Sequence, residues 1–228
     1  MTQSPATNDP ASIEGYARPA VTVDVLLFTI RGEKLQLALI KRGIEPHKGS
    51  WALPGGFVRM DEELEEAARR EIEEEIGVRD VFLEQLYTFG APDRDPRTRV
   101  ITIVYFALVP GEHLTLRADT DASDASWFAV GDLPKLAFDH EQIVAVALER
   151  LKGKIEYSNI AYGLLPARFR LSELQRVYEI ILGRALDKRN FRKRVLALGL
   201  VEATEKYSSG AHRPAQLFRW KKRRAKTF

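Results

Sequence analysis

Residues 55–78 constrain the fold more than any other stretch of the chain. A glycine pair, Gly55 and Gly56, opens a loop that leads into an uninterrupted run of good helix formers from 62 to 76. Gly77 follows where a C-terminal capping residue belongs. At about 100° per residue, the apolar positions of this run share one stripe: Leu64, Ala68, Ile72 and Ile76. The stretch therefore predicts a loop and one amphipathic helix that ends at Gly77.

Three carboxylates gather on one flank of this predicted helix. Glu71, Glu74 and Glu75 fall within an arc of about 100°, and like charges at that spacing need a compensating cation. Mg²⁺ or Mn²⁺ is the natural candidate, because these hard ions take oxygen ligands and bridge phosphates. The alternative is a solvated acidic helix face that binds nothing.

The spacing of the whole stretch decides between these two interpretations. Gly56 is followed after five residues by Glu62, and after seven more by Arg70-Glu71-Ile72. Glu74-Glu75 and Gly77-Val78 come next, with one residue between the groups. This pattern resembles the Nudix box at every fixed position.

The resemblance implies an α/β/α sandwich whose loop–helix–loop holds a divalent ion against a nucleoside diphosphate linked to another moiety. By position it implies these metal ligands and catalytic carboxylates: Glu71, Glu74 and Glu75. Gly56 would let the backbone pass close to the ion and the phosphate. Glu62 and Arg70 would be the pair that braces the loop.

Composition excludes several classes of protein. The chain has no cysteine, so disulfide frameworks and thiolate chemistry are excluded. No apolar run approaches the ~20 residues of a membrane span, and the first residues lack a secretory signal pattern. We therefore expect a cytoplasmic protein that is not bound to a membrane.

Charge divides the chain into two parts. Residues 1–150 carry 16 Lys and Arg against 26 Asp and Glu, whereas residues 151–228 carry 19 against 6. An acidic first part and a strongly basic second part predict two modules, the second with a polyanionic partner.

Strand and helix patterns in the first part agree with the Nudix fold. The predicted strands alternate with turn signals: 20–30, 35–40, 81–89, 100–109, 114–116 and 125–128. Asp24 interrupts the first strand, and a satisfied carboxylate is expected there. A helix is predicted from Asp139, its N-cap, to about Leu151, with a polar connector at 152–159. The resulting fold class is α+β, and the expected division is as follows: a mobile tail at 1–17, a Nudix domain at 18–152, a linker at 153–165 and a DNA-binding domain at 166–228.

The loop after the predicted strand 81–89 points to a substrate class. Pro92, about fifteen positions beyond the box, resembles the proline of Nudix hydrolases that handle ADP-ribose. Arg94 and Arg97 could pair with the diphosphate, and Phe89 or Tyr87 could stack on adenine. The alternative is a rigid surface turn whose arginines only keep it in solution.

The basic part contains a pattern of two helices and two strands. Ser172 and Gln175 form a capping-box signature, and Gly183 ends the first helix. Asp187 is the expected N-cap of the second helix, 188–198, with these residues facing inward: Phe191, Val195 and Leu198. Two strands at 201–207 and 214–220 complete the pattern, which predicts a winged helix-turn-helix domain.

In such a domain the second helix enters the major groove of double-stranded DNA. Its polar outer side offers groups that read base edges or bind phosphates: Lys188, Arg189, Asn190, Arg192 and Lys193. At the tip of the hairpin, Arg213 and the tail 221–224 would contact phosphates, and His212 is either a phosphate contact or an ordinary exposed residue. The alternative for the whole helix is a solvated basic face without a partner.

The order of the two modules carries a second resemblance. Residues 159–166, 171–179 and 186–192 are similar to the Nudix-related transcriptional regulators of NAD metabolism. The resemblance implies a homodimeric repressor on a palindromic operator, with ADP-ribose or a related NAD metabolite as effector.

One feature departs from many members of that group, whose Nudix box is damaged. Every fixed position of the box is present here, so Mg²⁺-dependent hydrolysis of ADP-ribose to AMP and ribose 5-phosphate stays open. Candidate general bases are Glu75, Asp93 and Asp95. The alternative to a regulator is accordingly an ADP-ribose pyrophosphatase whose basic domain serves dimerisation or localisation.

Overall fold

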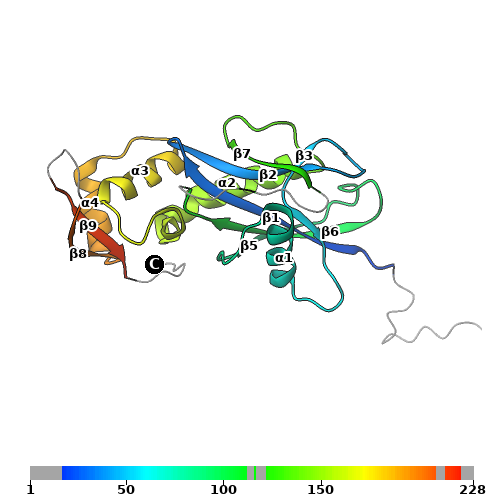
Figure 1. Ribbon diagram of the computed structural model, residues 1–228, viewed down its shortest axis with the longest axis horizontal. Coiled ribbons are helices and arrows are strands. Elements are labelled where there is room, and N and C mark those ends of the chain that lie inside the picture. The colour runs from blue at the N-terminus through cyan, green and yellow to red at the C-terminus, as the bar shows by residue number, and fades with distance from the viewer. Residues whose placement is uncertain (1–16, 112–115, 117–121, 209–213, 222–228) are drawn as a thin grey trace, which may run out of the picture.

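The computed structural model of the chain describes residues 17–111, 116, 122–208 and 214–221. Figure 1 shows an elongated molecule, with a mixed sheet and its helices at one end and a small helical module with a β-ribbon at the other. Most of the predicted tail, the first two residues of the predicted strand 114–116 and the tip of the C-terminal hairpin lie outside the described residues. In the part that is described, no helix is long and apolar enough to cross a membrane.

A seven-stranded sheet forms the first module. Its strands are β1 (Ala20–Arg31), β2 (Lys34–Arg42), β3 (Trp51–Ala52), β4 (Gly55–Phe57), β5 (Glu84–Phe89), β6 (Val100–Leu108) and β7 (Ala122–Ala129). The main order is β3-β2-β1-β6-β5, and β4 pairs with β1 while β7 pairs with β2. The predicted strands 20–30 and 35–40 correspond to β1 and β2, which form an antiparallel hairpin, and β1 runs parallel to β6.

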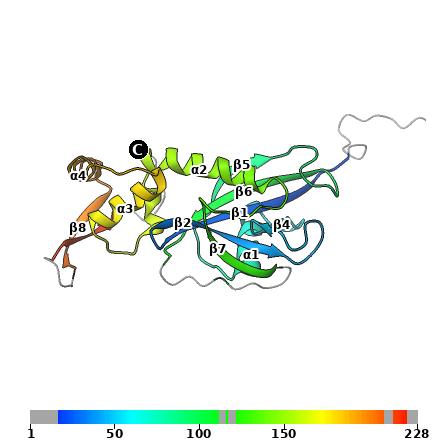
Figure 2. The same cartoon turned by 90° about the horizontal axis from the view of Figure 1, so that it is seen from above.

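The sheet lies between two helices, α1 (Leu64–Ile76) and α2 (His140–Tyr157) (Figure 2). Alternation along β1 explains both layers, because successive side chains of a strand point to opposite faces. Val25 and Leu27 pack in the cluster that includes α1, whereas Leu26 and Phe28 pack in the cluster that includes α2. The predicted α/β/α sandwich is confirmed.

The glycine pair before α1 differs from the expected turn. Gly55 and Gly56 lie in β4, opposite Asp24 and Val23 of β1. A Cβ on Gly55 would lie 2.2 Å from the carbonyl oxygen of Val23, so only glycine lets the two strands approach this closely. Gly77 does end α1, with a left-handed φ of 70°, as predicted.

Helix α2 is longer than the sequence indicated. It continues to Tyr157 instead of ending near Leu151, because Ile155 is fully buried and extends the apolar face by another turn. The predicted polar connector 152–159 is therefore mostly helix. The short 3-10 helix η1 (Ile160–Leu164) follows directly.

The second module is the predicted winged helix-turn-helix. It consists of α3 (Leu171–Leu182), α4 (Lys188–Ala197), β8 (Val201–Tyr207) and β9 (Gln216–Trp220), and the two strands pair antiparallel. The predicted N-cap Asp187 is confirmed, since its carboxylate accepts a hydrogen bond of 2.9 Å from the Asn190 backbone N–H.

Two details of this module were predicted wrongly. Ser172 does not cap α3, because the helix begins at Leu171 with Arg170 as its N-cap, and the carboxylate of Glu173 accepts the N–H of Arg170 at 2.6 Å. Leu198 is exposed, whereas Phe191 and Val195 are buried as expected. Leu198 follows the last residue of α4 and lines an open cavity together with Tyr178 and Leu182 of α3.

The two modules share one hydrophobic core. Ile155 of α2, Leu164 of η1 and Leu174 of α3 belong to a single buried cluster that reaches from the sheet to β9. An ion pair of 3.0 Å between Arg176 of α3 and Glu33 of the β1–β2 turn also joins them. A continuous core of this kind resists free rotation of one module against the other.

Candidate ligand cavity and nucleic-acid interface

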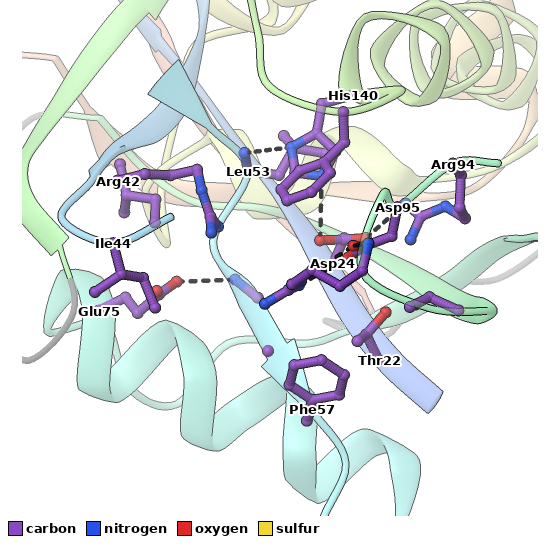
Figure 3. A pocket seen from close by; sticks show the side chains of 16 residues that line it. Thr22, Asp24, Arg42, Ile44, Leu53, Phe57, Glu75, Arg94, Asp95 and His140 are labelled. Atoms are coloured by element: carbon purple, nitrogen blue, oxygen red, sulfur yellow. Dashed lines mark hydrogen bonds and ion pairs between the residues drawn. The ribbon is translucent and has the colours of Figure 1, made fainter. Parts of the chain in front are cut away.

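A cavity of about 130 Å³ opens beside the box, where β1, β4, the loop after β5 and the start of α2 meet (Figure 3). Asp24 of β1 lies in its floor. Its carboxylate accepts a hydrogen bond of 2.7 Å from the Thr102 hydroxyl and lies 3.6 Å from Arg94 Nη2 and 3.5 Å from His140 Nε2. Asp24 is therefore satisfied, as predicted, and it also makes the floor anionic.

His140, the first residue of α2, connects the floor to the box loop. Its Nδ1 accepts a hydrogen bond of 3.0 Å from the backbone N–H of Leu53. Complete burial lowers the pKa of His140, so the ring is neutral and its proton resides on Nε2, which faces Asp24. No sequence pattern marked His140 as part of a site.

Arg94 lies in the cavity wall but is already engaged. Its Nε and Nη2 bind the two carboxylate oxygens of Asp139 at 3.0 and 2.7 Å, and its side chain is 4% exposed. This pairing also explains why Asp139 makes no side-chain cap at the start of α2. Arg94 is thus an internal support of the cavity, and the predicted contact with a diphosphate would have to compete with Asp139.

Two other arginines present charge to the cavity. Arg97 pairs with Asp95 at 2.7 Å and lies over the Phe57 ring, 5.4 Å from its centroid. Arg42 of β2 lies over the Phe138 ring at 4.9 Å, and burial together with the nearby charge of Arg97 lowers its pKa. Two neighbouring guanidinium groups form a positive wall suited to phosphate oxygens.

The aromatic side chains differ from the expectation. Phe89 is buried in the core cluster beside α2 and does not line the cavity. Tyr87, two residues earlier on the same face of β5, contacts Phe89 edge-on with ring centroids 5.4 Å apart, is 58% exposed and does not line the cavity either. Phe57, which directly follows the glycine pair, lines the cavity and is 47% exposed. Phe57 reaches the site because β4 pairs with β1 beside the cavity, and the loop motif alone does not indicate this pairing.

The box itself is organised by Arg70. Its Nε and Nη2 bind both carboxylate oxygens of Glu62 at 2.9 and 2.6 Å, and Nη2 also donates to the Phe57 carbonyl at 3.2 Å. The hydrogen bonds from Arg70, and then the backbone N–H of Arg59, lower the pKa of Glu62 to about 2. The expected pair of Glu62 and Arg70 is present and ties the loop to α1.

The same arginine also neutralises the acidic flank. Arg70 Nη1 lies 2.6 Å from Glu71 and 3.2 Å from Glu74. Glu75 is held separately, by a hydrogen bond of 2.8 Å from the backbone N–H of Gly55. Burial raises the pKa of Glu71, and burial with the charges of Glu71 and Asp24 raises that of Glu75 to about 8.

These carboxylates fit a divalent ion by chemistry, although they are not gathered around one point. A Cβ on Gly56 would lie 2.3 Å from Glu71 Oε1, so backbone and carboxylate meet here as oxygen ligation requires. Among the described residues, however, no three His, Cys, Asp or Glu side chains form a group that could hold a metal ion. Glu74 instead turns toward Arg59 and Arg70.

The outer side of α4 is the candidate nucleic-acid interface. All five of its predicted DNA-contacting residues are exposed: Lys188, Arg189, Asn190, Arg192 and Lys193. On the inner side Phe191 packs edge-on against Tyr178 of α3, with ring centroids 5.1 Å apart. His212 and Arg213 lie outside the residues that the structure describes.

Comparisons with known proteins agree with both modules. Residues 18–147 match the NUDIX domain, and residues 161–220 match the NrtR DNA-binding winged helix domain. The ADPR responsive transcriptional repressor NtrR of Acinetobacter baylyi is 38% identical over 209 residues, which cover 90% of this chain and 83% of that protein. The ADP-ribose pyrophosphatase of Methanocaldococcus jannaschii is 46% identical over 129 residues, or 57% of this chain and 73% of that enzyme.

Solved structures extend the likeness over both modules. Shewanella oneidensis NrtR, complexed with a 27mer DNA, superposes with a TM-score of 0.77 at 35% identity, covering 88% of this chain and 93% of that one. The NUDIX domain of the same protein, complexed with ADP ribose, matches with a TM-score of 0.56 at 35% identity, covering 61% and 93%.

The sandwich, its box and the winged helix together define a Nudix protein with a DNA-binding module. The likeness to a repressor over most of both chains makes the assignment more specific. The chain belongs to the NrtR family of Nudix-related transcriptional regulators.

Proposed function

We propose that this chain is a transcriptional repressor that binds operator DNA through α4 and the wing, and ADP-ribose or a related nucleotide through the Nudix cavity. The observation that carries the proposal is the outer side of α4, where cationic side chains stay exposed while the inner side packs on α3. Such a helix is suited to the major groove. The repressor and the DNA complex among the relatives support the same assignment.

The cavity offers a contact for each part of such a nucleotide. Arg42 and Arg97 would bind the diphosphate, because guanidinium groups pair with phosphate oxygens. Arg97, which is bound to Asp95 but 40% exposed, would use the part of its guanidinium that Asp95 leaves open. Phe57 would stack on the base, since its ring lines the cavity and is half exposed. The relative whose NUDIX domain is complexed with ADP ribose supports this ligand.

The proposal includes a homodimer on a palindromic operator that controls NAD biosynthesis genes in the cytoplasm. Two copies related by a two-fold axis would present two α4 helices to half-sites about one helical turn apart. We propose the domain boundaries 18–152 and 166–228, as inferred from the sequence. The burial of Ile155, Ile160 and Leu164 supports a packed connection between the two domains.

A gel shift with duplex DNA from upstream of NAD-synthesis genes tests this function. Full-length protein should bind the fragment, and ADP-ribose should change the apparent Kd more than NAD does. Replacing Arg189 and Arg192 with Ala should abolish binding, at about 1–3 kcal/mol for each base interaction removed. Arg150→Ala, on the exposed face of α2, is the control. DNA binding that survives the double substitution would rule out α4 as the helix that contacts the bases (the reading helix).

The complete box favours a second candidate function, Mg²⁺- or Mn²⁺-dependent ADP-ribose pyrophosphatase. Water would attack one phosphorus of the diphosphate, the bridging P–O bond would break, and AMP and ribose 5-phosphate would leave. A bound ion would neutralise phosphate charge and acidify the attacking water. Its proposed ligands are Glu71, Glu74, Glu75 and the backbone at Gly56. The enzyme that is 46% identical supports this candidate.

The chain itself would hold the substrate through Arg42 and Arg97. Of the three candidate bases, Glu75 and Asp95 line the cavity, whereas Asp93 does not. Release of AMP from ADP-ribose with and without Mg²⁺ tests this activity. Glu74→Gln combined with Glu75→Gln should remove it, and an unchanged rate would exclude these carboxylates as catalytic ligands.

A further inference from the structure

Helix α2 is the one described helix that contacts both the ligand cavity and the reading helix. Its first residue, His140, lines the cavity, and Glu156 near its end contacts α4. At 1.5 Å per residue, its 18 residues span about 27 Å. Figure 2 shows α2 running along the sheet toward the winged-helix module.

The cavity end of α2 is fixed by groups that a ligand would touch. Arg94 lines the cavity and at the same time binds both oxygens of Asp139, the residue before the helix. His140 is held between Leu53 of the box loop and Asp24 of the floor. An anion that pairs with Arg94 would weaken its hold on Asp139 and so loosen one of the attachments that fix the start of α2.

The other end of α2 contacts α4 through a hydrogen bond. Arg194 Nη2 donates a hydrogen bond of 2.6 Å to the backbone carbonyl of Glu156. Carbonyls in the last turn of a helix are unsatisfied and carry partial negative charge, so a guanidinium binds well there. Arg194 lies on the same helix as Arg189 and Arg192 but is turned toward α2. Arg184, in the α3–α4 turn, pairs with the Glu156 carboxylate at 3.4 Å.

Between its ends α2 is packed as a rigid body. Ile143, Ala147, Leu151 and Ile155 are almost completely buried, and all belong to the core cluster that includes α3 and Phe191 of α4. Closely packed interiors transmit a displacement instead of absorbing it. A shift at the start of α2 is thus passed to the far end.

We propose that α2 couples the occupancy of the Nudix cavity to the position of α4, and that the contact between Arg194 and the Glu156 carbonyl is its output. Arg194 is a positioning residue, which touches neither the ligand nor a base. The inference rests on the proposed function, because it assumes a nucleotide in the cavity and DNA on α4.

The test measures the coupling itself. ADP-ribose is titrated by calorimetry into full-length protein, alone and saturated with the duplex fragment that the gel shift identifies. The ratio of the two Kd values is the coupling factor, and by linkage it equals the effect of ADP-ribose on DNA affinity. In Arg194→Gln, a wild-type factor of about 5–150 in either direction should fall to within about twofold of one. The affinity for ADP-ribose without DNA and the affinity for DNA without ADP-ribose should each stay within about threefold of wild type.

Two further variants make the result specific. Arg150→Gln removes the same charge from the exposed face of α2 and should leave the factor unchanged. Arg194→Lys keeps a cation that can reach a carbonyl and should give an intermediate factor. If Arg194→Gln fails to melt cooperatively, Arg194→Lys alone decides, with an unchanged factor counting against the proposal.

Each outcome has a distinct meaning. One outcome is a wild-type coupling factor that differs from one and remains unchanged in Arg194→Gln. That result would overturn the proposed role of α2 and leave the proposed regulator function standing. A fall of equal size in Arg150→Gln would also overturn it, because net charge would then explain the loss. A wild-type factor of one would instead remove the effector part of the proposed function.

Discussion

At the scale of residues, Arg70 is the most heavily used side chain in the described part of the box. It binds Glu62, Glu71, Glu74 and the Phe57 carbonyl at once. These bonds raise the pKa of Arg70, mainly through Glu62, so its charge persists at any pH the fold tolerates. The loop, the helix and the acidic flank therefore depend on one cation.

This dependence predicts an acid-sensitive contribution from Glu62. Its pKa is lowered to about 2 in the folded chain, whereas an unfolded Glu titrates near 4.3. The ion pair should therefore stabilise the fold above about pH 4.3, and the gain should disappear as pH falls toward 2. Urea unfolding of wild type and Glu62→Gln, compared from pH 7 to pH 2, measures this difference.

Glu65→Gln is the control, because Glu65 pairs with Arg69 on the exposed side of the same helix. An exposed pair four residues apart contributes only about 0.3–0.5 kcal/mol. Equal effects of the two substitutions at pH 7 would show that Glu62 does not brace the loop.

The choice of aromatic ring in the cavity makes a second prediction at this scale. Phe57→Leu should weaken ADP-ribose binding by about 1–3 kcal/mol, the range of base–aromatic stacking, as measured by calorimetry. Tyr87→Leu should leave the affinity unchanged, because Tyr87 does not line the cavity. The opposite pattern would favour the stacking role that the loop motif suggested for β5.

Part of the site could be read from the sequence and part could not. The box residues lie on one helix and the loop before it, so their spacing alone places Glu62 beside Arg70. Arg42 and His140 reach the cavity from elements about a hundred residues apart. Contacts of the segment 51–53 with β2 on one side and with the start of α2 on the other bring them together. The proline-marked loop did supply cavity residues, but the engagement of Arg94 by Asp139 depends on where α2 begins.

At the scale of elements, helix existence was predictable and helix ends less so. A single capping residue determines where a helix begins or ends only if no stronger tertiary contact competes for its side chain. At Asp139 such a contact exists, because its carboxylate pairs with Arg94 instead of capping α2. The sequence predicted the end of α2 too early, because Ile155 is surrounded by polar residues in the sequence. Its burial in the structure extends the helix. Asp187 and Gly183, both free of such competition, act as their residue types predict.

The junction between η1 and β6 gives a prediction for this scale. A Cβ on Gly163 would lie 2.5 Å from the carbonyl oxygen of Leu108, so η1 packs against the sheet through bare backbone. Gly163→Ala should lower the free energy of unfolding by about 1–3 kcal/mol, as overpacking does. Urea unfolding monitored by circular dichroism measures it.

Gly153 provides a matched comparison within α2. It is helical, and a Cβ there would meet no atom within 4 Å. Gly153→Ala should raise stability by roughly 0.5–1 kcal/mol, because alanine is the better helix former. If both substitutions proved neutral, η1 would not be seated on the sheet as described.

At the scale of the whole molecule, the acidic and basic parts of the sequence form two spatially separate modules. The acidic sandwich and the basic module lie at opposite ends of the molecule (Figure 1). This arrangement keeps the box carboxylates away from the polyanion that the basic end would bind. The two-module organisation was therefore predictable from charge, although the continuous core between the modules was not.

This organisation predicts a strong effect of salt on DNA binding. The outer side of each α4 carries four cations, Lys188, Arg189, Arg192 and Lys193, and the proposed dimer would present two such helices. Each phosphate that they neutralise contributes about −0.9 to the slope of log K against log salt, so we expect a slope of about −4 to −7 by fluorescence anisotropy. Arg192→Ala should make the slope shallower by about one for each phosphate that Arg192 neutralises. A slope near zero would exclude a phosphate-binding face.

The arginine at the centre of the box has a wider consequence. Because Arg70 supplies positive charge to Glu71 and Glu74 from within the chain, the acidic helix carries its own counter-ion and can fold before any metal arrives. A receptor and a hydrolase can then be built from the same set of residues. The difference between a receptor and a hydrolase would then depend on whether a divalent ion can displace the Arg70 guanidinium from those carboxylates. Small changes in the loop around them could shift this competition in either direction.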